Sequence, residues 1–305
     1  MDIYFNARYP FSKSAKEYAE SAGLKLDYDS IEKGKRRAEE AVIRKRIPSI
    51  ADSSFDLAGE IASYAIARMI VSQIGMRQAI ESHAIAEAKR ASAYLKGESE
   101  ENLKSLARDF GIDSEEAVPV LKYLSYSPQE SPYKLVNMKL VEGRVFVSRG
   151  QLIRVLEEAI KLRISGSLPV KMEKVLPEIK KAADDIKGLM PKPEVRVVTI
   201  GDRPPCITHM LERMAKGENL PHSARWTLTI YLLKSGMKTS DVIKLFSTSP
   251  DYSEKITRYQ VEYILKKGYS MPSCKLIDSH GHCVYRCGIH SPLAYRGKKS
   301  EPKTI

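Results

Sequence analysis

The sequence lacks a hydrophobic run long enough to cross a lipid bilayer, for which a helix needs about 20 predominantly apolar residues. Its most apolar stretch, residues 61–76, is interrupted by Arg68 and Gln73. The amino terminus also lacks the basic segment followed by an apolar segment that marks a secretory signal. These two absences argue against an integral membrane protein and an exported one. They predict a soluble, intracellular and cytoplasmic protein.

The signature motifs of several enzyme classes are missing too: the phosphate loop G-x-x-x-x-G-K-[ST], the nucleophile elbow G-x-S-x-G and the zinc motif H-E-x-x-H. Asp27 and Asp29 do have the D-x-D spacing that two-metal polymerases and nucleases use to hold cations. They also stand just before a predicted helix, where Asp is a good capping residue. Asp184 and Asp185 are adjacent on a predicted helix and therefore point in different directions. The sequence thus favours a binding or regulatory subunit without an active site of its own.

Cysteine, histidine and tryptophan are scarce and unevenly placed. Residues 196–305 contain all four cysteines, five of the six histidines and the single tryptophan. The same segment has 18 Lys and Arg against 9 Asp and Glu, so 18 − 9 = +9 of the total net charge of +12 lies there. Because a positive field attracts polyanions, this segment is expected to meet an anionic partner. A glycine and two prolines in residues 188–194 predict a boundary between domains at 1–190 and 191–305.

The pattern of apolar residues predicts a mainly α fold, helical in both domains. The predicted helices cover residues 31–46, 53–95, 98–110, 114–126, 151–164, 171–187, 204–216, 221–235, 239–246 and 253–267. Gly59 and Gly75 lie inside the second helix, which predicts a kink or a break. Near-alternation of apolar residues around Glu142 and Gly143 predicts a small β-hairpin over residues 134–147. After Gly268 little regular structure is expected, so this tail needs an external staple to be ordered.

The four cysteines are the best candidates for such a staple. Cys206 follows two prolines at the start of a predicted helix, and Cys274, Cys283 and Cys287 lie in the irregular tail. A four-thiolate centre could hold zinc or a [4Fe–4S] cluster. Only the last two cysteines have the short spacing that is usual for structural zinc, and the spacing alone leaves both metals open. Isolated buried thiols or disulfides are the alternatives without a metal.

Histidines flank the three cysteines of the tail, at positions 280, 282 and 290. Since neutral imidazole is a common metal ligand, any one of them could replace a thiolate. Taken singly, each is better interpreted as an exposed loop residue.

Basic and aromatic residues gather in two segments of the same domain. His222, Arg225 and Trp226 are spaced i, i+3 and i+4 at the start of a predicted helix, so they share one face. Arg258 and Tyr259 form the second group. A cation beside an aromatic ring at a helix N-terminus suits a phosphate with a stacked base. The alternative is structural: a tryptophan in the core, an arginine paired with an acidic neighbour and tyrosines in helix packing.

Residues 203–297 contain five ordered motifs: Pro205-Cys206-Ile207, Asn219 to Trp226, Leu245 to Tyr252, Thr257 to Gln260 and Gly268 to Cys274. Together these motifs resemble the large subunit of archaeal and eukaryotic DNA primase. The resemblance is specific here because it combines all four cysteines with the motifs between them. Over the first 190 residues it rests on helical character and length.

The resemblance implies a helical first domain that docks the catalytic small subunit, and a second domain built around one [4Fe–4S] cluster. The cluster ligands would be Cys206, Cys274, Cys283 and Cys287. His222 and Arg225 match the family's His-x-x-Arg phosphate-contacting motif, next to Trp226. Arg258 and Tyr259 fall in its template- and nucleotide-facing segment.

The function so implied is that of a non-catalytic regulatory subunit in the DNA replication machinery. Its partners would be the small subunit, the single-stranded DNA template, the RNA primer and the initiating nucleoside triphosphate, in an archaeal nucleoid. The alternative is a zinc-stapled nucleic-acid-binding protein unrelated to priming. A stand-alone iron–sulfur nuclease or glycosylase would need a carboxylate or lysine site that the sequence does not display.

Overall fold

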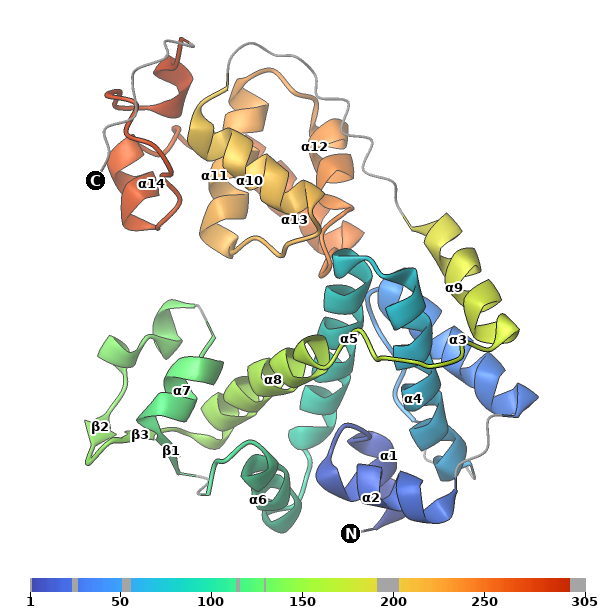
Figure 1. Ribbon diagram of the computed structural model, residues 1–305. Coiled ribbons are helices and arrows are strands. Elements are labelled where there is room, and N and C mark those ends of the chain that lie inside the picture. Colours follow the sequence, from blue (N-terminus) through green and yellow to red (C-terminus); the bar gives the residue numbers. More distant parts are fainter. Residues whose placement is uncertain are drawn as a thin grey trace. The chain divides into compact units, whose positions relative to one another are not determined.

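The computed structural model describes residues 2–23, 27–50, 56–113, 116–128, 130–190 and 203–296. The chain divides into two compact units, Met1–Met190 and Pro191–Ile305, and each is described by itself (Figure 1). The described residues form fourteen α-helices and one three-stranded antiparallel sheet, which confirms the prediction of a mainly α fold. None of the helices described has both the length and the apolar character needed to span a bilayer.

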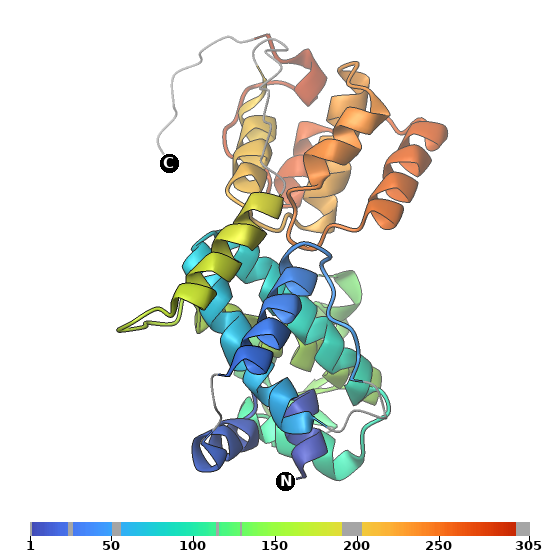
Figure 2. The same cartoon turned by 90° about the vertical axis from the view of Figure 1, so that its right-hand side faces the viewer.

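Nine helices build the first unit in the residues that are described. They are α1 (Ile3–Arg8), α2 (Lys13–Ala22), α3 (Tyr28–Val42), α4 (Leu57–Ile74), α5 (Arg77–Leu95), α6 (Glu100–Asp109), α7 (Val120–Tyr126), α8 (Arg149–Gly166) and α9 (Pro177–Leu189). Helix α3 packs along α4, and α8 packs along α5 (Figures 1 and 2). Helices α1 and α2 were not predicted from the sequence.

Two glycines determine where α4 ends and how closely α3 packs on it. Gly75 ends α4 with a φ of 65°, a left-handed conformation that glycine adopts without strain, so the predicted break between two helices is confirmed. Gly34 lies where α3 crosses α4, and a Cβ atom at this position would stand 2.4 Å from Cγ2 of Ile66. Any larger residue at position 34 would therefore push the two helices apart.

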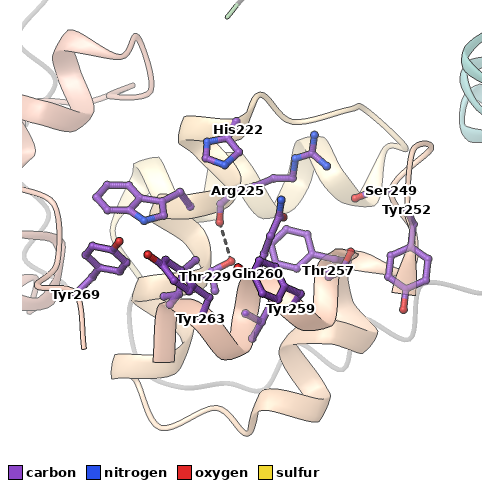
Figure 3. A pocket seen from close by; sticks show the side chains of 14 residues that line it. His222, Arg225, Thr229, Ser249, Tyr252, Thr257, Tyr259, Gln260, Tyr263 and Tyr269 are labelled. Atoms are coloured by element: carbon purple, nitrogen blue, oxygen red, sulfur yellow. Dashed lines mark hydrogen bonds between the residues drawn. The ribbon is translucent and has the colours of Figure 1, made fainter. Parts of the chain in front are cut away.

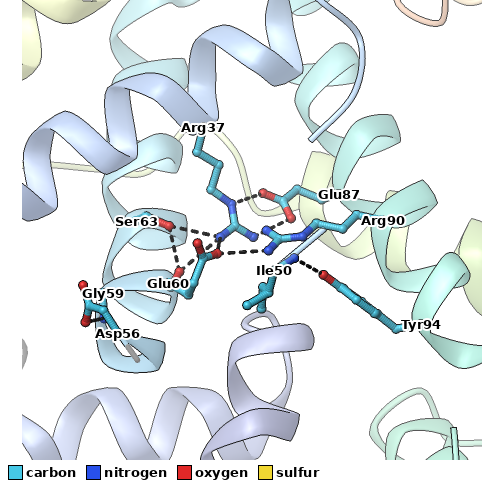
Figure 4. Close-up of polar contacts among 9 residues, drawn as sticks. All are labelled: Arg37, Ile50, Asp56, Gly59, Glu60, Ser63, Glu87, Arg90 and Tyr94. Atoms are coloured by element: carbon cyan, nitrogen blue, oxygen red, sulfur yellow. Dashed lines mark hydrogen bonds and ion pairs between the residues drawn. The ribbon is translucent and has the colours of Figure 1, made fainter. Parts of the chain in front are cut away.

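A charged cluster is buried between α3, α4 and α5 (Figure 4). Arg37 donates to both carboxylate oxygens of Glu87, at 2.7 and 2.8 Å, and both side chains are almost fully buried. Arg37 also contacts Glu60 and Ser63, and Arg90 reaches Glu60 at 3.0 Å. Removing one member of such a cluster would leave a buried charge uncompensated, which is strongly destabilising.

The small sheet has the order β1 (Ala117–Pro119), β3 (Arg144–Phe146), β2 (Leu140–Val141). The hairpin of β2 and β3 is confirmed, and its turn residues Glu142 and Gly143 both have positive φ angles. The helix predicted over residues 114–126 is wrong in its first half. Residues 114 and 115 lie outside the described residues, and Val118 pairs with Val145, so the helix begins only at Val120.

The second unit has five α-helices within the described residues. They are α10 (Pro205–Ala215), α11 (His222–Lys234), α12 (Thr239–Phe246), α13 (Glu254–Lys267) and α14 (Cys274–Ser279). Their apolar faces meet in a core that includes Met210, Leu228 and Val242. The tail after Gly268 is more regular than predicted, because Ser273 caps α14 through a hydrogen bond to the amide of Leu276.

Candidate functional site

A cavity of about 210 Å³ opens in the second unit among α11, α13 and the segment between α12 and α13 (Figure 3). Four of the five binding residues predicted from the sequence line it: His222, Arg225, Trp226 and Tyr259. The fifth, Arg258, is not among the lining residues. Its guanidinium donates to Glu254 at 2.7 Å, one turn earlier on α13, and this ion pair is exposed.

His222 and Arg225 lie in the first turn of α11. Pro221 is the N-cap residue and provides no side-chain hydrogen bond, so the cap leaves the first amides of α11 without a side-chain acceptor. These amides and the helix dipole make the start of a helix favourable for an anion. The exposed imidazole of His222 and the half-buried guanidinium of Arg225 stand at this end of the cavity (Figure 3).

Arg225 is held by Asp251, which comes from the segment between α12 and α13. Its two terminal nitrogens donate to the two carboxylate oxygens at 3.1 and 3.0 Å. The structural alternative for Arg225 is an ion pair with an acidic neighbour, and the structure contains this ion pair. Since a guanidinium has five N–H groups, this bidentate pair orients Arg225 and uses two of its donors.

Aromatic rings line the cavity beside these cations. Tyr259 stacks on Tyr263 with ring centres 6.0 Å apart, and Tyr263 lies 6.5 Å from Tyr269. Tyr269 meets Trp226 edge-on at 5.8 Å. Tyr259 is 66% exposed, so its ring is open to solvent on one side. Such rings can stack on nucleic-acid bases of any sequence.

Three of the lining residues that were not singled out as binding residues from the sequence are Tyr269, Thr229 and Ser249. Tyr269 follows the glycine that ends α13, and only the fold returns its ring to the cavity. Thr229 lies one turn beyond Arg225 on α11, a spacing that could have pointed to it. Ser249 is 2% exposed, and its hydroxyl has no hydrogen-bond partner among the described residues.

The four cysteines come from three separate segments. Cys206 is in the first turn of α10, Cys274 begins α14, and Cys283 and Cys287 follow in the tail. All four are free thiols, so the disulfide alternative is wrong for this structure. Cys283 and Cys287 both direct their Sγ atoms to the carbonyl oxygen of Tyr285, at 3.4 Å each.

The thiols influence one another electrostatically. Burial, with smaller contributions from the other three thiols, raises the pKa of Cys206 to about 11. Burial raises the pKa values of Cys274 and Cys287 as well, and neighbouring cysteine thiols add to the effect at both residues. Four thiolates at this place would repel one another, so the thiolate form needs a positive centre to stabilise it.

Within the ranges that the structure describes, no three His, Cys, Asp or Glu side chains form a group that could hold a metal ion. The flanking histidines have other contacts. His282 is almost buried and shares a hydrogen bond of 2.8 Å with the hydroxyl of Ser223. The carbonyl oxygen of His290 accepts from the amide of Cys274 at 2.9 Å.

Comparison with known proteins identifies the class to which this fold and site belong. Residues 198–302, which contain the four cysteines and the cavity, match the family model described as the C-terminal domain of the large subunit of eukaryotic and archaeal DNA primase. This match confirms the resemblance found in the sequence.

Relatives extend the similarity to nearly the whole chain. The DNA primase large subunit PriL of Methanococcoides burtonii is 34% identical, and the alignment covers 98% of this chain and 93% of the relative. The corresponding protein of Methanocella arvoryzae is 32% identical, with 98% and 89% covered. That of Halobacterium salinarum is 27% identical, with 95% and 92% covered. The chain therefore belongs to the family of DNA primase large subunits.

Proposed function

We propose that this chain is the non-catalytic regulatory subunit of a DNA primase, which stabilises the catalytic small subunit and supports initiation of RNA primers. In this role the second unit binds the single-stranded template and the initiating nucleoside triphosphate. The observation that carries the proposal is the cavity where the oriented guanidinium of Arg225 stands beside exposed aromatic rings. A binder unrelated to priming is disfavoured by the similarity to primase subunits over 98% of the chain.

The cavity offers separate contacts for the two ends of a nucleotide. The triphosphate would lie at the start of α11, where Arg225, His222 and the first amides of the helix supply donors. The base would lie toward Tyr259 and Tyr263, which provide a stacking surface. Arg258 is exposed beside Tyr259 and pairs with the exposed Glu254, and it would contact the backbone of the template.

We propose further that Cys206, Cys274, Cys283 and Cys287 hold one [4Fe–4S] cluster. Two observations support this centre: the other three thiols lie near enough to Cys206 to contribute to its raised pKa, and the segment that contains all four matches the family model of the primase large subunit. When bound, the cluster would supply iron–thiolate bonds that join the start of α10 to the tail.

A surface for the small subunit is proposed on α7, the small sheet and the segment between α7 and β2 in the first unit. Six large apolar side chains within residues 121–146 are exposed there: Leu121, Leu124, Val136, Leu140, Val141 and Phe146. Val136 is 87% exposed and Leu121 is 75% exposed, which is costly for a surface that stays in water. A protein partner of apolar character would remove this area from solvent.

Primer initiation by a reconstituted two-subunit primase tests the proposal. The Arg225→Ala variant removes charge-assisted hydrogen bonds worth roughly 1.5–3 kcal/mol, about 10- to 150-fold in affinity for the initiating nucleotide. Elongation of a preformed primer should stay unchanged, because it does not need the initiating triphosphate. Arg213→Ala is the matched control, since Arg213 belongs to the same unit and pairs with Glu218 away from the cavity. Normal initiation by a folded Arg225→Ala variant would overturn the proposal.

A further inference from the structure

A second cavity, of about 350 Å³, lies in the first unit. It is formed by the start of α2, one face of α4 and the last turn of α8. Its lining contains four cationic residues and no acidic one: Lys13, Lys16, Arg68 and Arg163. A hollow with four positive charges and no negative one in its wall favours an anion.

The two arginines are held in place by uncharged groups. The guanidinium of Arg68 lies 5.6 Å from the ring centre of Tyr64 and donates to Ser167 Oγ at 3.0 Å. Its Nε is buried and has no hydrogen-bond partner among the described residues. Arg163 lies 3.6 Å from the ring centre of Phe110 and donates to the backbone carbonyl of Asp109.

The two arginines of this cavity differ from the buried arginines of the same unit in that no carboxylate of a described residue is bonded to them directly. Arg37 and Arg90 are bonded directly to carboxylates of Glu87 and Glu60. Arg68 and Arg163 are each held by neutral acceptors and aromatic rings instead. Burial lowers the pKa of Arg163 even though the charge of Asp109 raises it, so this cation is compensated only in part.

The described carboxylates near the cavity form no strong ion pair with the ammonium groups of its two lysines, so these groups can bind an anion. Glu20 approaches Lys16 to 3.7 Å, but both side chains are more than two-thirds exposed, and such a surface pair contributes little. The carboxylate of Asp109 accepts from the backbone amide of Lys13 at 2.9 Å and helps to fix the start of α2. Both lysine side chains are exposed at the rim, where they can turn toward a bound anion.

Most of the remaining wall is apolar, apart from Ser12 and Ser167. Phe11, Ile61 and Ala65 line the cavity together with the ring of Tyr64. Its volume is near the lower end of the range of about 300–1,000 Å³ that is typical of small-molecule sites. A basic rim beside an apolar wall matches a molecule that has phosphates at one end and a flat ring at the other.

We propose that this cavity binds a nucleotide, with its phosphates at Lys13, Lys16, Arg68 and Arg163 and its base against the apolar wall. The site is distinct from the cavity at Arg225, because it lies in the other unit. The chain then has two nucleotide-binding sites, and one can be removed without the other.

Equilibrium dialysis of the full chain with ATP tests this inference. The Arg225→Ala background weakens binding at the cavity of the second unit about 10- to 150-fold, so the tight binding that remains reports on the first unit. Ala65→Trp would fill the cavity from an exposed position on α4 and should abolish the remaining binding. Lys13→Ala with Lys16→Ala should weaken it about 10-fold or more, because two charge-assisted contacts are lost. The matched control, Lys180→Ala with Lys181→Ala, removes two exposed lysines of α9 and should leave it unchanged.

Two further ligands separate the nucleotide from a simple anion. ATP should bind more tightly than pyrophosphate, and adenosine alone should bind weakly, because both ends of the molecule contribute. Equal affinities for ATP and pyrophosphate would overturn the assignment of a nucleotide. Absence of ATP binding in the Arg225→Ala chain, or binding that persists in the folded Ala65→Trp variant, would overturn the site itself. Circular dichroism melting of each variant establishes that it is folded.

Discussion

Ser223 and His282 share a hydrogen bond of 2.8 Å between Oγ and Nε2. Ser223 lies in the first turn of α11, next to the proposed triphosphate site, and His282 directly precedes Cys283. This bond therefore joins the helix that presents Arg225 to the segment that carries the thiols. The proposed nucleotide site and the proposed cluster are two parts of one structural unit, so damage to one should be felt at the other.

Ser223→Ala should lower the free energy of unfolding of the second unit by about 0.5–1.5 kcal/mol, the usual net value of one hydrogen bond. Fluorescence of Trp226 during denaturation measures this unit, because the chain has a single tryptophan. Ser223→Thr, which keeps a hydroxyl, should restore most of the loss. Ser247→Ala is the control, since its hydroxyl donates only to the carbonyl of Lys244 in its own helix turn. An equal loss in both alanine variants would contradict a special role for the bond between Ser223 and His282.

The proposed cluster predicts the metal content of the chain purified without oxygen. A [4Fe–4S] centre gives about four irons and four acid-labile sulfides per chain, with a broad visible absorption. Cys206→Ser should lose both and destabilise the second unit, because Cys206 is the thiol that joins α10 to the tail. A content of one zinc per chain and no sulfide would contradict the cluster and show that a zinc ion holds the thiols instead. Absence of both metals would mean that the thiols are structural.

The sequence was sufficient to predict most helices, because an apolar period of 3.6 residues is a strong local signal. It missed β1, since Ala117 to Pro119 is a short apolar run whose partner strand lies more than 20 residues later. Pairing over that distance is a property of the folded chain, and the local pattern cannot distinguish such a run from the start of a helix.

In the candidate site, too, local sequence patterns predicted some residues, and only the fold shows the contacts of others. Arg225 could be selected because His222, Arg225 and Trp226 share a helix face, and that spacing is local. The carboxylate that orients it, Asp251, is 26 residues away and is brought close only by the packing of α12 and α13 against α11. Ser249 lies within the motif Leu245 to Tyr252, but its place in the cavity wall could not be predicted, because an unpartnered buried hydroxyl is defined by the surrounding structure.

The exposed apolar surface predicts how the two primase subunits associate. Leu121→Glu with Leu124→Glu should prevent co-purification of the small subunit, because two buried charges would replace apolar contacts in the interface. The variant should remain folded, since both side chains are more than half exposed. Leu162→Glu is the control, because Leu162 is also exposed but lies on α8. If the double variant still binds the small subunit with unchanged affinity, the docking surface lies elsewhere.

His83 makes the first unit sensitive to acid. It is fully buried against Tyr64, and neither of its ring nitrogens has a hydrogen-bond partner among the described residues. Burial lowers the pKa of His83 from 6.5 to about 4. The folded chain therefore binds fewer protons than the unfolded chain between these two values, and its stability falls as the pH decreases from about 6.5 to about 4.

Glu87 adds to this acid sensitivity at lower pH. Burial alone would raise the pKa of Glu87, but the charge and hydrogen bonds of Arg37 outweigh burial and lower it. The stability that comes from the ionised carboxylate is complete above the unfolded pKa of Glu and is lost as the pH falls below it. The effect of His83 should thus appear first during acidification, and the effect of Glu87 should follow.

His83→Leu should remove the first of these two effects. At pH 7.5 the variant should be at least as stable as the original chain, because no hydrogen bond is lost and an unpaired polar group leaves the core. Between pH 6.5 and 4 the original chain should lose about 3 kcal/mol more stability than the variant, because burial lowers the pKa of His83 from 6.5 to about 4. Hydrogen exchange of the amides of α4 and α5 measures this unit without interference from Trp226 or the thiols. His209→Asn, which changes an exposed histidine of α10, should keep the original pH dependence, and a His83→Leu variant that also keeps it would contradict this role for His83.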